Sequence, residues 1–229
     1  MEWNELSIDD IIIPEKTELD KFKEHIINND MNEVMKYLLS MVNDKETLNI
    51  CMKIAVFNDR IELVKLLIDY GADIHAKNDC VLSESIIKNK DSFDIVKFLI
   101  ENGANISNKY DDTTPLIVSV HYGHPDIVKL LLENGADIHA LDDYALTLSS
   151  RHGYYDIVKL LLESGADIHA EDDNPLREAV IEGHVDIVKL LVENGANNSI
   201  NKIIMVNKHD VSMVSLLNEY GINYQCMEN

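Results

Sequence analysis

The residues with the clearest chemical potential are three histidines at one repeated position. His75, His139 and His169 each stand in the sequence Asp-Ile-His-Ala. Imidazoles are common zinc ligands, but Zn–N distances of about 2.0–2.1 Å require the ligands to lie a few ångströms apart. Equivalent positions of stacked helical units lie about 8–10 Å apart. We therefore expect turn side chains that hydrogen-bond to the backbone, and no metal site.

Paired carboxylates and cysteines offer the other possible chemistry. Asp142-Asp143 and Asp172-Asp173 resemble metal-binding or catalytic carboxylates, but adjacent residues on a polar turn are usually solvated. Neither a Gly-rich phosphate loop nor a nucleophile–base pattern is present. The cysteines stand at unrelated positions without disulfide or metal-binding spacing: Cys51, Cys80 and Cys226. The sequence thus predicts no catalytic residue and no cofactor, and we expect a protein that is not an enzyme.

The composition excludes several classes of partner. The formal net charge of -21 and the pI near 4.6 disfavour nucleic acid and anionic membrane surfaces, because both attract Lys and Arg. The first residues lack the basic and apolar regions of a secretory signal, and no run approaches the roughly 18 apolar residues that span a bilayer. The low, odd cysteine count favours a reducing compartment. We expect a soluble, acidic, intracellular protein.

Internal repetition indicates which elements position these residues. Residues 126–140 recur almost letter for letter as residues 156–170, with looser copies from Glu62, Asp94 and Asp186. The glycine of each copy recurs at spacings of 32, 32, 30, 30 and 26 residues: Gly71, Gly103, Gly135, Gly165, Gly195 and Gly221. A period in this range is typical of a solenoid of helical pairs, in which each unit contacts only its neighbours.

The second helix of each unit is expected to be buried on most of its surface. At ~100° per residue, the Ile, Val and Leu side chains of residues 156–163 cover an arc of roughly 200°. The opposite side carries a lysine with an acid three residues before it and another four after it, which predicts a solvated ladder of ion pairs: Lys65, Lys97, Lys129, Lys159 and Lys189. The glycine that follows suits a left-handed C-cap.

The first helix of the unit, about Tyr144 to His152, contains two informative columns. One holds small residues in every unit, which predicts a close approach of helices: Ala55, Ser85, Ser119, Ser149 and Ala179. The other mixes apolar and acidic residues, which predicts a partly exposed edge: Ile54, Glu84, Val118, Leu148 and Glu178.

These repeats resemble ankyrin repeats. The resemblance is carried by Thr114-Pro-Leu-Ile117, by Gly123-His124 and Gly183-His184, and by the Ile-Val-Lys-Leu-Leu…Gly-Ala-Asp core. It implies an all-α, ankyrin-type solenoid of helical pairs with short loop or hairpin fingers, because two spacings are three residues below the usual 33. The 30-residue period, Asp-Asp-Tyr-Ala-Leu and Ile-His-Ala are most similar to the ankyrin families of giant DNA viruses of amoebae.

The resemblance divides the chain into five ankyrin-like repeats over 47–199, flanked by weaker ends. The repeats are 47–76, 77–107, 108–140, 141–170 and 171–199. Residues 17–46 read as a degenerate N-terminal capping pair of helices, and 200–229 as a degenerate C-terminal capping repeat and tail in which Ile203, Ile204 and Val206 belong to a first helix. Residues 1–16 match no repeat and form an N-terminal arm, either a short helix or strand-like.

One surface patch is a candidate for binding. Outward positions of the first helices are aromatic and mildly basic in the central repeats, and Tyr and Arg are over-represented in binding hot spots. The candidate protein-binding residues are His121, Tyr122, Arg151 and His152, with Tyr110 and Tyr144 nearby. The alternative is that these residues are exposed and unselected.

The resemblance implies a protein-interaction scaffold that binds a protein partner on its concave face. We expect a monomer whose partner is a host or viral protein in the host cytoplasm, with no nucleic acid or membrane bound. The alternative function is a substrate-recruiting adaptor of a ubiquitin ligase complex, which docks on the ligase through residues 1–46 or the C-terminal pair.

Overall fold

The computed structural model describes residues 16–28, 30–41, 44–88, 92–108, 113–196, 204–207 and 210–227. The chain forms two compact units, Met1–Asp73 and Ile74–Asn229, and each is described by itself. The predicted residues 1–15 of the N-terminal arm lie outside the described residues. None of the described helices is long and apolar enough to cross a membrane.

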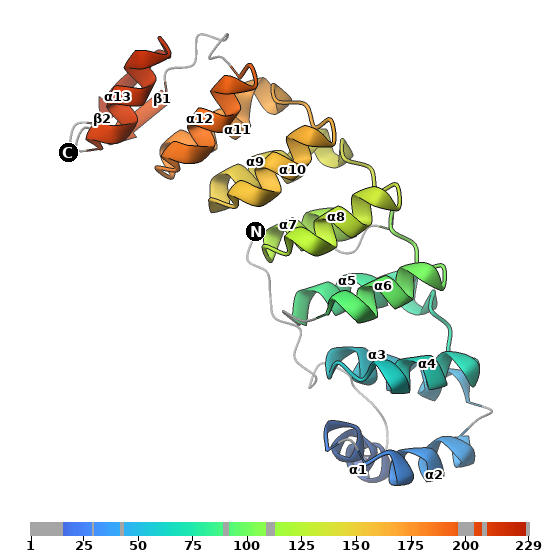
Figure 1. Ribbon diagram of the computed structural model, residues 1–229. Helices are drawn as coiled ribbons and strands as arrows, with labels where there is room; N and C mark the ends of the chain where they lie inside the picture. The colour runs from blue at the N-terminus through green and yellow to red at the C-terminus, as the bar shows by residue number, and fades with distance from the viewer. Residues whose placement is uncertain are drawn as a thin grey trace. The chain divides into compact units, whose positions relative to one another are not determined.

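The first unit consists of helices in successive pairs (Figure 1). The region that was predicted to form a capping pair contains α1 (Lys16–Ile27) and α2 (Met31–Met41), and it is followed by α3 (Lys45–Phe57) and α4 (Ile61–Asp69). Phe22, Ile26, Val34 and Leu38 are buried at helical spacing in the first pair. The Phe22 ring also stacks on Tyr37, with the ring centroids 4.3 Å apart.

The second unit continues the pattern in two layers (Figure 1). First helices contact first helices of the next pair, and second helices contact second helices, as the α7–α9–α11 and α8–α10–α12 series show. The first helices are α5 (Ala76–Lys88), α7 (Pro115–His121), α9 (Ala140–His152) and α11 (Ala170–Ile181). The second helices are α6 (Phe93–Glu101), α8 (Pro125–Glu133), α10 (Tyr155–Glu163) and α12 (Val185–Glu193). The predicted all-α fold class is confirmed.

The second helices have the predicted two-sided character. Ile157, Val158 and Leu161 of α10 are buried. Lys159 Nζ lies 3.9 Å from Glu163 Oε1 on the exposed side, and the same i,i+4 ion pair recurs in α6, α8 and α12. Gly165 has a φ of +95°, and a Cβ there would meet no atom within 4 Å. Glycine is therefore required by the left-handed backbone and not by lack of space.

The small-residue column of the first helices is buried as predicted. Ser85, Ser119 and Ser149 have almost no exposed surface. Each hydroxyl donates a hydrogen bond to the backbone carbonyl three residues earlier, and the Ser149 Oγ–Leu146 O distance is 3.0 Å. The hydroxyls are thus satisfied within their own helix, and the packing can be close.

The predicted exposed edge at Leu148 is wrong. Leu148 is 5% exposed, and Ile54 and Val118 of the same column are also buried, whereas Glu84 and Glu178 are half-buried. Burial in this column therefore depends on the residue type. An apolar side chain packs inward, whereas a carboxylate at the same position remains partly exposed to solvent.

The C-terminal end departs from the expected helical pair. Ile204 and Val206, predicted in a first helix, lie in strand β1 (Ile204–Asn207), which contacts α11 and pairs in parallel with β2 (Tyr224–Met227). Helix α13 (Val211–Glu219) connects the strands and buries Met213 and Leu217, while Val211 is 75% exposed. The sequence Ile203-Ile204-Met205-Val206 contains three β-branched residues, which favour a strand, and this strand packs on α11. Ile203 itself lies outside the described residues.

Candidate functional site

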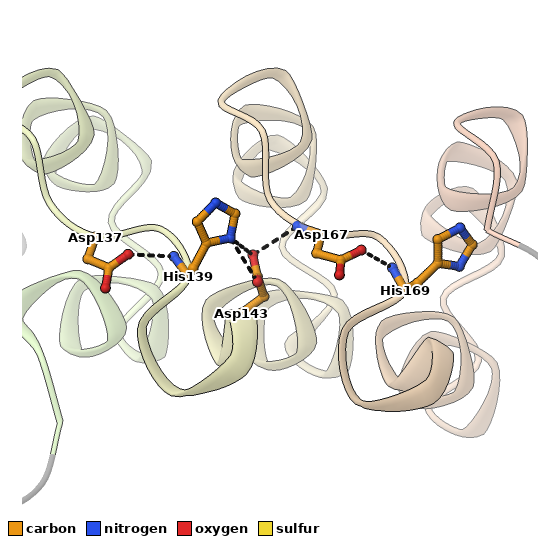
Figure 2. A network of polar contacts seen from close by, with 5 residues as sticks. All are labelled: Asp137, His139, Asp143, Asp167 and His169. Atoms are coloured by element: carbon orange, nitrogen blue, oxygen red, sulfur yellow. Dashed lines mark hydrogen bonds and ion pairs between the residues drawn. The ribbon is translucent and has the colours of Figure 1, made fainter.

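The turn that leads into α9, together with the first residues of this helix, contains a hydrogen-bonded carboxylate network (Figure 2). His139 Nδ1 donates to Asp143, with an N–O distance of 3.0 Å to Oδ2. Oδ1 of the same carboxylate accepts the backbone N–H of Asp167 at 2.8 Å, in the turn of the next repeat. Asp137 Oδ1 accepts the His139 backbone N–H at 3.0 Å. Asp143 is therefore a link between two repeats, because one carboxylate binds groups from both.

The network repeats along the chain. His169 Nδ1 lies 2.5 Å from Asp173 Oδ1, and Asp167 Oδ1 accepts the His169 backbone N–H at 2.9 Å. In the first unit, the amide oxygen of Asn49 accepts the Asp73 backbone N–H at 2.7 Å, which is the same 24-residue separation as Asp143 to Asp167. A side-chain oxygen at this position of the repeat thus accepts a backbone N–H from the turn of the next repeat.

Two sequence predictions are corrected by this network. Nδ1 of His139 and Nδ1 of His169 each bind a carboxylate, where a backbone partner was predicted. Asp143 and Asp173 are not solvated turn residues, because they are 5% and 2% exposed. Adjacent residues in sequence point in different directions here, so that the second aspartate of the pair is buried while Asp142 is exposed.

The short finger is a turn of left-handed backbone. Leu141, Asp142 and Asp143 have φ values of +55°, +57° and +57° with positive ψ. This conformation costs roughly 1–2 kcal/mol for each residue that carries a Cβ. The Asp143 hydrogen bonds offset part of this cost, because they fix the end of the turn against His139 and the next repeat. The predicted short finger is therefore formed by a left-handed turn of three residues.

The described residues offer little for metal or enzyme chemistry. No group of three or more His, Cys, Asp or Glu among them is placed to hold a metal ion. Burial raises the pKa of the Cys51 thiol to about 12, so this sulfur stays protonated. A groove of about 300 Å³ lies between α8 and α10 and is lined by Lys129, Leu132, Glu133, Ala136, Ile138, Leu160 and Ser164. It carries no nucleophile–base pair among these residues.

Replacing Asp143 with asparagine is expected to lower the pKa of His139 while the fold is kept. The hydrogen bond and the charge of Asp143 hold the pKa of His139 above its ordinary value of 6.5. The asparagine side chain would keep an oxygen acceptor for the Asp167 N–H, as Asn49 does for Asp73. NMR titration of the imidazole C–H signals measures the change. Asp142→Asn removes the same charge from an exposed side chain and should leave the His139 pKa nearly unchanged. An equal decrease in both variants would contradict the assignment.

The second candidate surface lies at the C-terminal ends of the first helices, where each chain segment turns into the second helix. We call it the turn row; its residues in α7, α9 and α11 and directly after them are His121, Tyr122, Arg151, His152, Ile181 and Glu182. The His121 and His152 rings meet edge to face with centroids 5.5 Å apart, and the His121 and Tyr122 rings meet in the same way at 5.0 Å. Three of the predicted binding residues are therefore in one cluster.

Arg151 joins this cluster to the next repeat. Its Nε lies 3.6 Å from Glu178 Oε2 and 4.0 Å from Glu182 Oε1. These distances exceed the ~2.7–2.9 Å of a charge-assisted hydrogen bond, so both are loose ion pairs. The Arg151 side chain is 57% exposed. The predicted mildly basic character of the patch is thus offset by two carboxylates.

The structure adds residues that sequence reasoning missed. The Tyr154 ring stacks on His152 with centroids 5.4 Å apart, and a Cβ on Gly123 would lie 2.8 Å from that ring. His184 Nε2 donates to the Arg151 carbonyl oxygen at 3.1 Å, and its ring lies against Gly153. These rings rest on glycines of the preceding repeat and support the turn row. The sequence signal for these residues is a glycine followed by His or Tyr at the same position of successive repeats.

Tyr144, another predicted binding residue, does not join the cluster. Tyr144 begins the right-handed part of α9, eight residues before His152, which at 1.5 Å per residue places it about 12 Å away along the helix. It lies at the end of α9 that carries Asp143. Tyr110 lies outside the described residues.

The histidines of the turn row are expected to titrate on the acidic side of 6.5. Burial, followed by the neighbouring charge of His152, lowers the pKa of His121; burial, followed by Arg151, lowers that of His152. The unfolded chain therefore binds more protons, and this contribution to stability is complete above pH 6.5 and is lost as the pH falls below it. His139 has the opposite sign, because its stabilisation is lost as the pH rises through its raised pKa. NMR titration should place His121 and His152 below 6.5 and His139 above it; the reverse order would contradict both environments.

Comparison with known protein families agrees with this architecture. A family model described as ankyrin repeats (3 copies) matches residues 80–142 and 140–202, and a model described as ankyrin repeat matches residues 49–79. No curated protein gives a match. The matched segments cover the helical pairs from most of α3 to α12, the His–Asp turns and the turn row, and together they span more than half of the chain. The chain therefore belongs to the ankyrin-repeat family.

Proposed function

We propose that this protein is a non-enzymatic scaffold that binds a protein partner through the turn row, on the face predicted to be concave. Ankyrin repeats generally mediate protein–protein interaction, and proteins built from them are typically non-enzymatic. The observation that carries the proposal is the lateral continuity of the row. His121 contacts His152, and Arg151 contacts Glu182, so side chains from three successive repeats form one surface.

Rigidity supports this surface as a binding site. The rings of Tyr154 and His184 lie against Gly123 and Gly153, which holds the turns of neighbouring repeats together beneath the row. Tyr and His side chains have few rotatable bonds, so little conformational entropy is lost when a partner orders them. His121, Tyr122, Arg151 and His152 are the proposed contacts. Tyr144 lies at the opposite end of α9 and is not required for them.

A capture experiment with paired variants tests the proposal. The wild-type chain and Tyr122→Ala/His152→Ala are used as baits in amoebal lysate, following the resemblance to giant-virus ankyrin families. Lys159→Ala/Lys189→Ala is the matched control, because both lysines belong to exposed ion pairs of second helices. A partner that is lost with the turn-row variant and kept with the lysine variant supports the proposal. A partner lost with the lysine variant alone would overturn it.

The same capture tests the adaptor alternative. No feature of the described residues favours docking on a ubiquitin ligase. Recovery of cullin-complex subunits by both the wild-type and the Tyr122→Ala/His152→Ala baits would favour the adaptor, because a ligase contact through the chain ends would not involve the turn row.

A further inference from the structure

We propose that the turn row selects an Arg or Lys side chain of its protein partner, with Glu178, Ile181 and Glu182 as the receiving surface. This inference rests on the proposed function and names the chemistry of the partner. The three residues have the spacing i, i+3 and i+4 at the end of α11, which places them on one face of the helix.

The first argument is the balance of charge. Glu178 and Glu182 both approach the single guanidinium of Arg151, so this group of three carries a net charge of one negative unit. Neither contact has the length of a hydrogen bond, and the carboxylate oxygens therefore keep their capacity to accept N–H donors. Arg177, the nearest cation in sequence to Glu178, is half-buried and holds the register position of the buried Thr147, 30 residues earlier.

The second argument is the apolar group between the carboxylates. Ile181 is 48% exposed, among the most exposed large apolar side chains in the described chain. Arg and Lys have an apolar stem and a charged end, and they bury the stem along apolar surface while the head reaches polar groups. An isoleucine flanked by two carboxylates matches both parts of such a side chain. His152, the exposed sequence neighbour of Arg151, carries a ring that stacks on Tyr154 and adds aromatic surface to the row.

The third argument is the field of the whole chain. A formal net charge of -21 attracts a cationic segment over a distance beyond contact and repels an acidic one. Asp143 and Asp173 are buried, so the carboxylates next to the row are Glu178, half-buried in α11, and Glu182, exposed directly after it.

A displayed library of random ten-residue peptides, panned on the purified full chain, tests the proposal. Enriched peptides are expected to share an Arg or Lys next to an apolar residue. Synthetic peptides from the selection should bind Glu178→Gln/Glu182→Gln at least about tenfold more weakly than the wild type, and added salt should weaken wild-type binding. The matched control is Glu163→Gln/Glu193→Gln, which removes two charges from the ladder of the second helices and should change affinity less than twofold.

Arg151→Ala gives a second, opposite readout. It removes one proposed contact but also the internal competitor for the two carboxylates. For short peptides centred on an Arg or Lys the second effect is expected to be the larger, so their binding should become severalfold tighter. Enriched peptides without a basic residue, or equal binding to the wild type and Glu178→Gln/Glu182→Gln, would overturn this inference. If the peptides in either of these cases still lose binding to the Tyr122→Ala/His152→Ala variant, the proposed function stands and only the Arg or Lys selectivity is wrong. An absence of enrichment, or binding unaffected by every turn-row variant, would count against the proposed function itself.

Discussion

Two adjacent serines of α9 are expected to respond to valine in opposite directions. Ser149→Val should lower the free energy of unfolding by ~1–3 kcal/mol, because Ser149 is completely buried in the column that holds small residues in every repeat. Ser150→Val should raise it by about 1 kcal/mol. The Ser150 hydroxyl is also buried but has no hydrogen-bond partner among the described residues, and valine or isoleucine fills the equivalent position of the other repeats: Val56, Ile86, Val120 and Val180.

The comparison is internally matched, because both variants add the same atoms to the same helix. Any cost of a β-branched residue in a helix is nearly equal for the two and cancels in their difference. Denaturant unfolding of both variants and the wild type measures the effect. Ser149→Ala is a further control that should lie within about 1 kcal/mol of the wild type, since Ala55 and Ala179 occupy the same column. Equal midpoints for the two valine variants would contradict the packing described for α9.

Loss of two aromatic groups from the turn row is expected to weaken partner binding by ~2 kcal/mol or more, about thirtyfold in Kd. The double variant Tyr122→Ala/His152→Ala removes the ring that meets His121 and the ring that stacks on Tyr154. These groups lie in neighbouring central repeats, where both sides of the surface are held by packed helices. Calorimetry with the captured partner measures the change, and circular dichroism should show an unchanged helical content.

The lysine ladder of the second helices provides the control for this variant. Lys159→Ala/Lys189→Ala should change the Kd less than twofold, because each exposed i,i+4 ion pair contributes only about 0.3–0.5 kcal/mol to the helix and none to the row. If the lysine variant weakens binding and the Tyr122→Ala/His152→Ala variant does not, the partner binds the second helices and the turn-row site is wrong.

The sequence by itself determined the repeated local structure. The spacing of Ile157, Val158 and Leu161 required a helix buried on one side, and the lysine four residues before Glu163 required the other side to face water. Gly165 follows the end of the helix because the backbone there is left-handed, a conformation that glycine adopts at low cost and that strains a residue with a Cβ. These features depend on contacts within one repeat or with an identical neighbour, so periodicity alone is sufficient to predict them.

Tertiary structure decided what each polar side chain binds. A left-handed turn that the residue types do not predict lies between His139 and Asp143. Asp143 binds the backbone of Asp167 only when two repeats stack. The side chain of Arg151 likewise meets Glu178 and Glu182 from another repeat, which changes a predicted basic patch into a surface with net negative charge. Hydrophobic periodicity places a helix face, but a hydrogen bond or ion pair depends on the distance between groups from different repeats. That distance is set by the packing of the repeats against one another.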